Sequence, residues 1–157
     1  MRILGVDDGR RRIGLAVSDP SGTLARPLTC LAGAEVLAGA LALIERLAAD
    51  DEGLGGVVVG LPSRLDGSPN EQTPHALAFA DALKARCGVP VTLQDERLSS
   101  LEAERRLALR ERDWRRRKAQ LDAAAAAVIL QDYLDAEARR HAAAAVPGVP
   151  HDDEAQP

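Results

Sequence analysis

The sequence predicts a single α/β domain, with a sheet that opens in an antiparallel hairpin and carries helices on both faces. Its 157 residues fall within the usual size of one domain and can bury one core. The expected order is three strands, a helix, a strand, a helix, a strand and then helices. A β-branched run at residues 56–61 lacks the alternation of a half-exposed strand, so it indicates a strand covered on both faces.

The first part of the chain predicts three extended segments. Residues 2–7 and 13–17 are short apolar runs separated by an Asp-Gly pair at residues 8–9, which is typical of a β-hairpin. Residues 23–31 form a third extended segment. Because Pro27 cannot donate a hydrogen bond to a neighbouring strand, this segment is expected at an edge of the sheet or as an irregular strand.

Helices alternate with strands in the rest of the chain. Residues 35–49 carry apolar side chains at helical spacing and predict a helix with one buried face. A second helix is expected over residues 71–86, followed by a short strand at residues 91–94. Two further helices are expected over residues 101–110 and 118–140.

The end of the chain and the composition restrict the classes of function. Residues 1–141 are expected to form the domain, and the acidic, proline-containing residues 142–157 to form a disordered tail. Aromatic residues make up 2% of the chain, which argues against a platform that stacks nucleic-acid bases on rings. The net charge of −4 argues against a simple electrostatic binder of nucleic acid, unless positive charge is concentrated in one place.

Neither a membrane span nor a secretory signal is evident. No stretch approaches the roughly 20 apolar residues of a membrane span, so a cytoplasmic location without membrane contact is expected. Cys30 and Cys87 fit no metal-binding or redox spacing and are expected to be small core residues. The three histidines are scattered and predict no zinc site.

Carboxylates lie at the ends of the predicted core elements. Asp7 ends the first strand, and Asp95 and Glu96 end the last. Asp122 lies near the start of the final helix. Brought together, such acids would raise one another's pKa unless a divalent cation neutralised them. Side chains alternate along a strand, so Asp7 and Asp8 should face opposite ways, and at most one is expected as a principal metal ligand unless the turn is bulged.

Asp122 belongs to the stripe of its helix that should pack on the sheet. Ala125, Ala126 and Ile129 follow it at helical spacing on the same face. An aspartate favoured by the helix dipole in a first turn is the alternative explanation. Five consecutive alanines at residues 123–127 would let the helix approach the sheet closely, which would bring Asp122 near the acids at the strand ends.

Positive charge is concentrated just before Asp122. Residues 103–118 hold eight basic and three acidic side chains, a net charge of +5. Such a run is commonly a solvated helix face, but its excess of one sign beside candidate carboxylates fits phosphate contact equally well. The sequence contains neither a P-loop nor a dinucleotide-binding fingerprint.

Four groups of short motifs follow one another along the chain. They are Gly5-Val6-Asp7-Asp8-Gly9 with Arg12-Ile13-Gly14-Leu15-Ala16-Val17-Ser18-Asp19, Val58-Val59-Gly60-Leu61-Pro62 with Asp66-Gly67-Ser68, Asp95-Glu96-Arg97-Leu98-Ser99-Ser100 with Glu102-Ala103, and Arg117-Lys118 with Asp122, Ala125-Ala126, Ile129-Leu130-Gln131 and Tyr133-Leu134. Together, over about residues 2–135, they resemble the YqgF/RuvX family of RuvC-like nucleases.

The resemblance implies an RNase H-like fold with a mixed central sheet and a site for two divalent ions, Mg²⁺ or Mn²⁺. Asp7, Glu96 and Asp122 fall on the family's acidic motif positions and are expected to be both catalytic residues and metal ligands, with Asp7 bridging the ions. The implied function is a nuclease that matures the 5′ end of pre-16S rRNA, with a Holliday junction resolvase as the alternative. Asp8 departs from the family, in which this position is usually apolar or aromatic.

Basic residues beside these acids are expected to hold nucleic-acid phosphates. They are Arg10, Arg12, Arg97, Arg115, Arg116, Arg117 and Lys118. A non-catalytic nucleic-acid-binding module of the same fold is a further alternative, although all three acids are present. An actin-like ATPase or sugar kinase would need a duplicated pair of such domains, and this chain holds one. A homodimer would suit the cleavage of a junction, in which two strands are cut.

Overall fold

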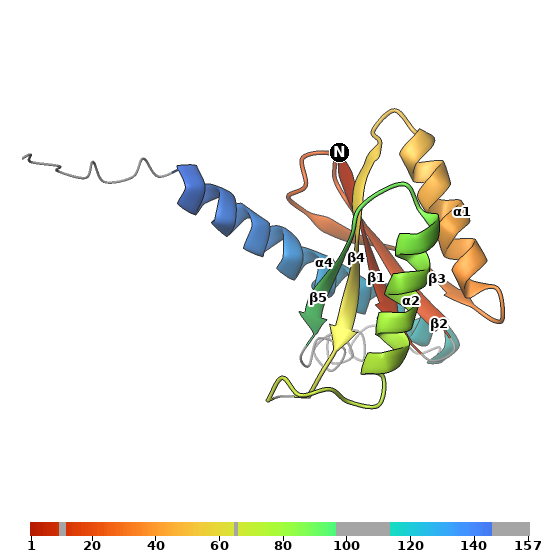
Figure 1. The fold of residues 1–157 in the computed structure, drawn as a ribbon. Helices are drawn as coiled ribbons and strands as arrows, with labels where there is room; N and C mark the ends of the chain where they lie inside the picture. Colours follow the sequence, from red (N-terminus) through yellow and green to blue (C-terminus); the bar gives the residue numbers. More distant parts are fainter. Residues whose placement is uncertain (10–11, 65, 97–113, 146–157) are drawn as a thin grey trace, which may run out of the picture.

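The fold is a five-stranded sheet covered by helices. In the computed structural model, residues 1–9, 12–64, 66–96 and 114–145 are described, without the side chains of residues 114–119. The strand order is β3-β2-β1-β4-β5. The strands are β1 (Arg2–Asp8), β2 (Arg12–Ser18), β3 (Ala25–Ala32), β4 (Leu54–Pro62) and β5 (Val91–Glu96), and the helices are α1 (Val36–Ala49), α2 (Thr73–Arg86) and α4 (Trp114–Ala145) (Figure 1).

The sheet is mixed, and the predicted hairpin is confirmed. β1 pairs antiparallel with β2, and β2 with β3, whereas β1 pairs parallel with β4, and β4 with β5. β3 forms one edge of the sheet, as Pro27 predicts, and its pairing with β2 shifts register between Leu15 and Ala16. The β-branched run lies in β4, between two parallel neighbours, where both faces are covered.

Helices pack on both faces of the sheet, as expected. α1 and α2 lie on one face and α4 on the other (Figure 1). Side chains alternate between two cores: Leu4 and Val6 of β1 pack with α1 and α2, while Ala16 and Val58 pack with α4. The same alternation directs Asp7 toward α4 and the next residue, Asp8, toward α2.

Some element boundaries differ from those expected. β5 continues to Glu96, so both strand-end acids lie within the strand. α4 begins at Trp114 and runs for 32 residues, so it continues to Ala145, into the segment expected as a tail. Its last turns project beyond the sheet (Figure 1). The helix expected over residues 101–110 and the remaining tail residues 146–157 lie outside the described residues.

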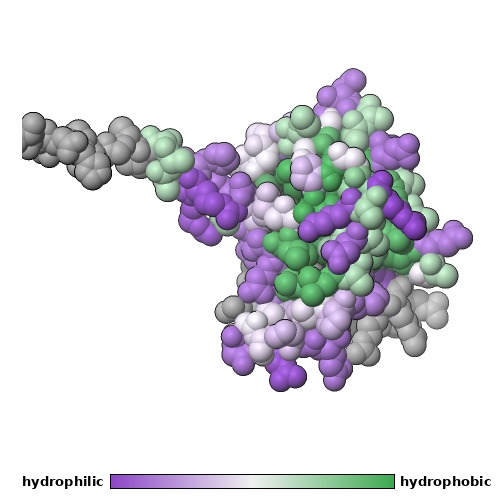
Figure 2. All heavy atoms as spheres, in the orientation of Figure 1, coloured by the Kyte–Doolittle hydropathy of each residue, from purple (hydrophilic) through white to green (hydrophobic). Residues whose placement is uncertain are grey.

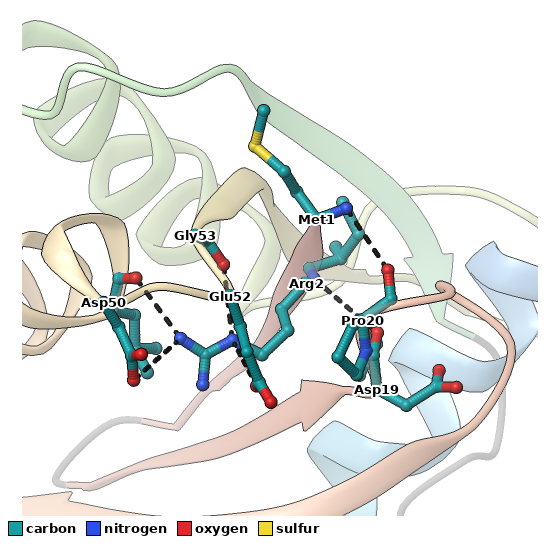
Figure 3. Close-up of polar contacts among 10 residues, drawn as sticks. Met1, Arg2, Asp19, Pro20, Asp50, Glu52 and Gly53 are labelled. Carbon is teal, nitrogen blue, oxygen red and sulfur yellow. Dashed lines mark hydrogen bonds and ion pairs between the residues drawn. The ribbon is translucent and has the colours of Figure 1, made fainter.

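A buried arginine fixes the start of β1, at the end of the strand away from Asp7. Arg2 is only 6% exposed. Its guanidinium donates to the carbonyls of Leu47 and Gly53 and pairs with the carboxylates of Asp50 and Glu52, at 3.3 and 3.4 Å (Figure 3). A buried cation without such partners would be strongly destabilising. These contacts fasten β1 to the end of α1 and the start of β4.

The face formed by α1 and α2 also carries exposed apolar side chains (Figure 2). A groove of about 580 Å³ lies where these two helices end, and Leu41, Ile44, Cys87 and Val89 are among its lining residues. Cys87 is half-buried and packs against the core from the wall of this groove. Among the described residues, none of the helices has the length and apolar character needed to cross a bilayer.

Candidate active site

Asp7 is flanked by glycine on both neighbouring strands. On the antiparallel side its register partner is Gly14 of β2, and Gly14 in turn pairs with Cys30 of β3. On the parallel side Val6 pairs with Val59, so the next residue along β4, Gly60, lies beside Asp7. Both glycines face α4, which leaves space next to Asp7 for side chains that come from elsewhere.

The space over Gly14 is occupied by the backbone of α4. A Cβ atom at Gly14 would lie 1.8 Å from the carbonyl oxygen of Asp122 and 2.9 Å from the backbone nitrogen of Ala123. Such distances are far inside van der Waals contact, so only glycine allows the helix to rest here. The alanines that follow Asp122 permit the same close approach from the helix side, as the sequence predicts.

The space over Gly60 is shared by α4 and Glu96. A Cβ atom at Gly60 would lie 2.6 Å from Cδ1 of Ile129 and 3.0 Å from Oε2 of Glu96. Glu96 pairs in register with Pro62 near the end of β5 and is 8% exposed. Its carboxylate therefore reaches across β4 toward Asp7.

The three predicted acids come together around Asp7. Burial raises the pKa of Asp7 well above its ordinary value, and the nearby charges of Glu96, Asp122 and Asp8 raise it further, as does a side-chain hydrogen bond with Glu96. A carboxyl group surrounded in this way is unfavourable in its charged form. The arrangement is therefore one that a bound cation would stabilise.

We expect Asp7 to make the stability of the metal-free protein depend on pH. Its pKa is raised in the folded protein, so between the unfolded and folded pKa values the folded state binds more protons. Stability should therefore be greatest near the lower end of this range and fall as pH rises through the folded pKa. Thermal unfolding with a chelator at pH 5 and pH 8 measures this, and Asp7→Asn should show a smaller difference in Tm. Equal differences in the two proteins would contradict the assignment.

Asp122 is held by residues from β2 and β3. Its Oδ2 forms an ion pair with Nε of Arg12 at 3.2 Å and accepts a hydrogen bond from the thiol of Cys30 at 3.5 Å. Burial, together with the Asp122 carboxylate, raises the pKa of the Cys30 thiol to about 11. Cys30 was expected in the core, but it lies beside the acid cluster because it shares a face with Gly14.

The other two candidate acids have different partners. Asp8 is buried on the opposite face, where its Oδ2 lies 2.6 Å from Nδ1 of His75 in the first turn of α2. Burial raises the pKa of Asp8, although the contact with His75 opposes this. Asp95 accepts a hydrogen bond from the Ser63 hydroxyl at 2.7 Å. Asp8 therefore points away from the acids around Asp7.

The predicted basic residues are placed only in part. Arg12 lies at the site, although its Nε is engaged by Asp122. Arg10 and Arg97 lie outside the described residues. Arg115, Arg116, Arg117 and Lys118 belong to the first two turns of α4, before Asp122, where the structure describes the backbone alone.

Four residues have roles at these acids that the sequence did not predict. Gly14 and Gly60 make room for the acids, Cys30 bonds to Asp122, and His75 bonds to Asp8. Only the glycines gave a signal, because a glycine inside an apolar strand often marks a close approach of another segment. The other contacts depend on strand register and helix placement.

Carboxylate oxygens are the ligands that Mg²⁺ and Mn²⁺ prefer, so Asp7, Glu96 and Asp122 fit such an ion in donor chemistry. The described residues hold no ready cluster of three such groups around one point. Instead, the acids are occupied with one another and with Arg12. An ion would therefore replace contacts that now satisfy these carboxylates.

The strand order, the antiparallel hairpin and the carboxylates around Asp7 together define an RNase H-like α/β protein. Its acidic site lies where β1 and β5 end. A solved structure of the same fold is that of T. thermophilus RuvC in complex with Holliday junction substrate, with a TM-score of 0.51, 18% identity and coverage of 88% of this chain and 96% of that chain. The chain belongs to the RuvX family, described as Holliday junction resolvase, whose pattern matches residues 1–136.

Two relatives align with this chain over nearly the whole of their own length. One from Anaeromyxobacter dehalogenans is 49% identical over 138 residues, which cover 88% of this chain and 99% of the relative. Another from Pelotomaculum thermopropionicum is 39% identical over 156 residues, which cover 97% of this chain and 99% of the relative. Each carries the name "Putative pre-16S rRNA nuclease".

Proposed function

We propose that this protein is a divalent-metal-dependent nuclease that cleaves phosphodiester bonds in the 5′-end maturation of pre-16S rRNA. The observation that carries the proposal is that Glu96 and Asp122, from two other elements, lie close enough to the buried Asp7 for their charges to raise its pKa. Mutually repelling carboxylates cost stability, so their assembly is better explained by a ligand than by the fold. The choice of pre-16S rRNA as the proposed substrate rests on the names of the relatives.

The three acids have a defined part in this chemistry. Asp7, Glu96 and Asp122 would hold Mg²⁺ or Mn²⁺, with Asp7 shared between two ions. When bound, such ions supply an activated water and neutralise charge on the phosphate. Gly14 and Gly60 keep the acids in place by admitting α4 and the Glu96 carboxylate.

The basic residues would position the nucleic acid. Arg115, Arg116, Arg117 and Lys118 precede Asp122 by four to seven residues on α4, or about 6–10 Å along the helix axis. Phosphates held there would lie near the acids. Arg10, Arg12 and Arg97 would add contacts to the scissile phosphate or its neighbours.

We expect the triple substitution of Arg115, Arg116 and Arg117 by alanine to weaken nucleic-acid binding and to flatten its salt dependence. Removing one arginine–phosphate ion pair should reduce the slope of log K against log salt by roughly 0.7 to 0.9. Binding of labelled RNA at several salt concentrations measures this. An unchanged affinity and slope would indicate that this segment is an ordinary solvated helix face.

A Holliday junction resolvase is the second candidate, favoured by the description of the family. It would act on a four-way DNA junction, and cutting two strands would call for a homodimer, which sedimentation can detect. Both candidates use the same acids, so the substrate distinguishes them.

The experiment that tests the proposal is a substrate panel. The protein is incubated with Mg²⁺ or Mn²⁺ and with labelled RNA carrying the 5′ leader of 16S rRNA, single-stranded DNA or a four-way junction. We expect metal-dependent cleavage of the RNA that Asp7→Asn lacks. Cleavage confined to the junction would favour the resolvase. Equal background cleavage by both proteins on every substrate, with binding retained, would indicate a non-catalytic module.

A further inference from the structure

One carboxylate oxygen of the site is already engaged from two neighbouring strands. Oδ2 of Asp122 pairs with Nε of Arg12 at 3.2 Å and accepts the Cys30 thiol at 3.5 Å. Arg12 lies two residues before Gly14 on β2, and Cys30 pairs with Gly14 on β3, so both side chains share the face that α4 covers. The two groups flank the position at which the helix rests on Gly14.

The charges at the site explain why such a contact would matter. Asp122 and Glu96 both lie near enough to Asp7 for their charges to raise its pKa, so each repels the Asp7 carboxylate. Arg12 supplies a positive charge directly on one of them, and both partners of the pair are largely shielded, at 29% and 25% side-chain exposure. The ion pair therefore offsets part of the repulsion that gathering the acids creates.

A metal ion and Arg12 would compete for the same carboxylate. An ion bound by Asp122 must either use the remaining oxygen, close to the guanidinium, or displace Arg12 from Oδ2. In both cases two positive charges are brought near each other, which opposes binding of the ion. The contact that assembles the acids in the absence of metal thus also lowers the affinity for metal.

We infer that Arg12 is a positioning residue. Its guanidinium supplies the positive charge beside Asp122 until a divalent ion takes its place. The inference rests on the proposed metal-dependent function, since it concerns the acids assigned to the ions. It gives Arg12 a role before any nucleic acid binds. Once released from Asp122, the guanidinium becomes available to a phosphate.

Calorimetric titration with Mn²⁺, without nucleic acid, tests the inference in the full chain. Arg12→Gln should bind Mn²⁺ at least about threefold more tightly than the wild type, because a competing charge is gone. Its metal-free Tm should be lower and its rise in Tm on adding Mn²⁺ larger. Arg12→Lys, which keeps the charge, should bind Mn²⁺ nearly as the wild type does. Arg26→Gln is the matched control, because Arg26 pairs with Val17 at the other end of β3.

The outcomes separate this inference from the proposed function. Equal or weaker Mn²⁺ binding by Arg12→Gln, with clear binding by the wild type, would overturn the inference alone. Absence of Mn²⁺ binding by the wild type would overturn the proposed function as well. If Arg12→Gln did not fold, Arg12→Met, which also removes the charge and keeps an unbranched side chain, takes its place with the same expected result; unchanged or weaker Mn²⁺ binding would overturn the inference.

Discussion

Asp7→Asn is expected to lower phosphodiester cleavage by about 10³-fold or more, because it removes the acid whose charge interacts with both others and which would be shared between the ions. The same substitution should raise the Tm of the metal-free protein by several degrees. An amide keeps the shape of the side chain and removes the charge that burial and neighbouring carboxylates make unfavourable. A gain in stability with a loss of activity is the pattern expected of a site that stores electrostatic strain.

Single-turnover cleavage and thermal unfolding measure these two effects. Asp95→Asn is the matched control, since Asp95 is an acid at the end of the same strand as Glu96 but bonds to Ser63. It should keep cleavage within about threefold of the wild type, as expected for a substitution outside the reacting groups. Full activity of the Asp7→Asn protein would show that Asp7 does not belong to the site.

Gly14→Ala is expected to destabilise the protein by about 3 kcal/mol or more, at the upper end of the range for overpacked cores. The added Cβ would meet the backbone of Asp122 and Ala123, at 1.8 and 2.9 Å. A backbone cannot turn aside as a side chain can, so α4 would have to move away from the sheet. That movement would also draw Asp122 away from Asp7, and cleavage should be abolished even in molecules that fold.

Urea denaturation of the two proteins gives the difference in the free energy of unfolding. Gly88→Ala is the control, because a Cβ there would meet nothing within 4 Å. It should change stability by less than about 1 kcal/mol. A Gly14→Ala protein as stable as the wild type would show that the helix does not depend on this contact.

Much of the fold could be predicted from the sequence because the pattern of each element was clear. The β-branched run of β4 and the hairpin turn each have one natural interpretation, and Pro27 marks β3 as an edge strand. Strand order and the exact ends of β5 and α4 depend on tertiary packing, which periodicity does not express. Their positions became clear only in the assembled sheet.

The proximity of these acids could also be predicted, whereas the residues that contact them could not. Asp7 and Glu96 lie at the ends of their strands, where a carboxylate at a core boundary is conspicuous, and Asp122 shares a helix face with apolar residues of α4. The roles of Gly14 and Cys30 arise from cross-strand register, because they share one row with Asp7 across three strands. A register of this kind joins residues far apart in the chain, and no local pattern marks it.

The most direct test of the site is a crystal structure of the wild type soaked in Mn²⁺, with data collected for the anomalous signal of manganese. We expect manganese bound to the Asp7 carboxylate, with Glu96 and Asp122 completing its ligands, and no such signal in Asp7→Asn. Manganese bound elsewhere on the protein, with the three acids keeping their present contacts to one another and to Arg12, would contradict the assignment of the site.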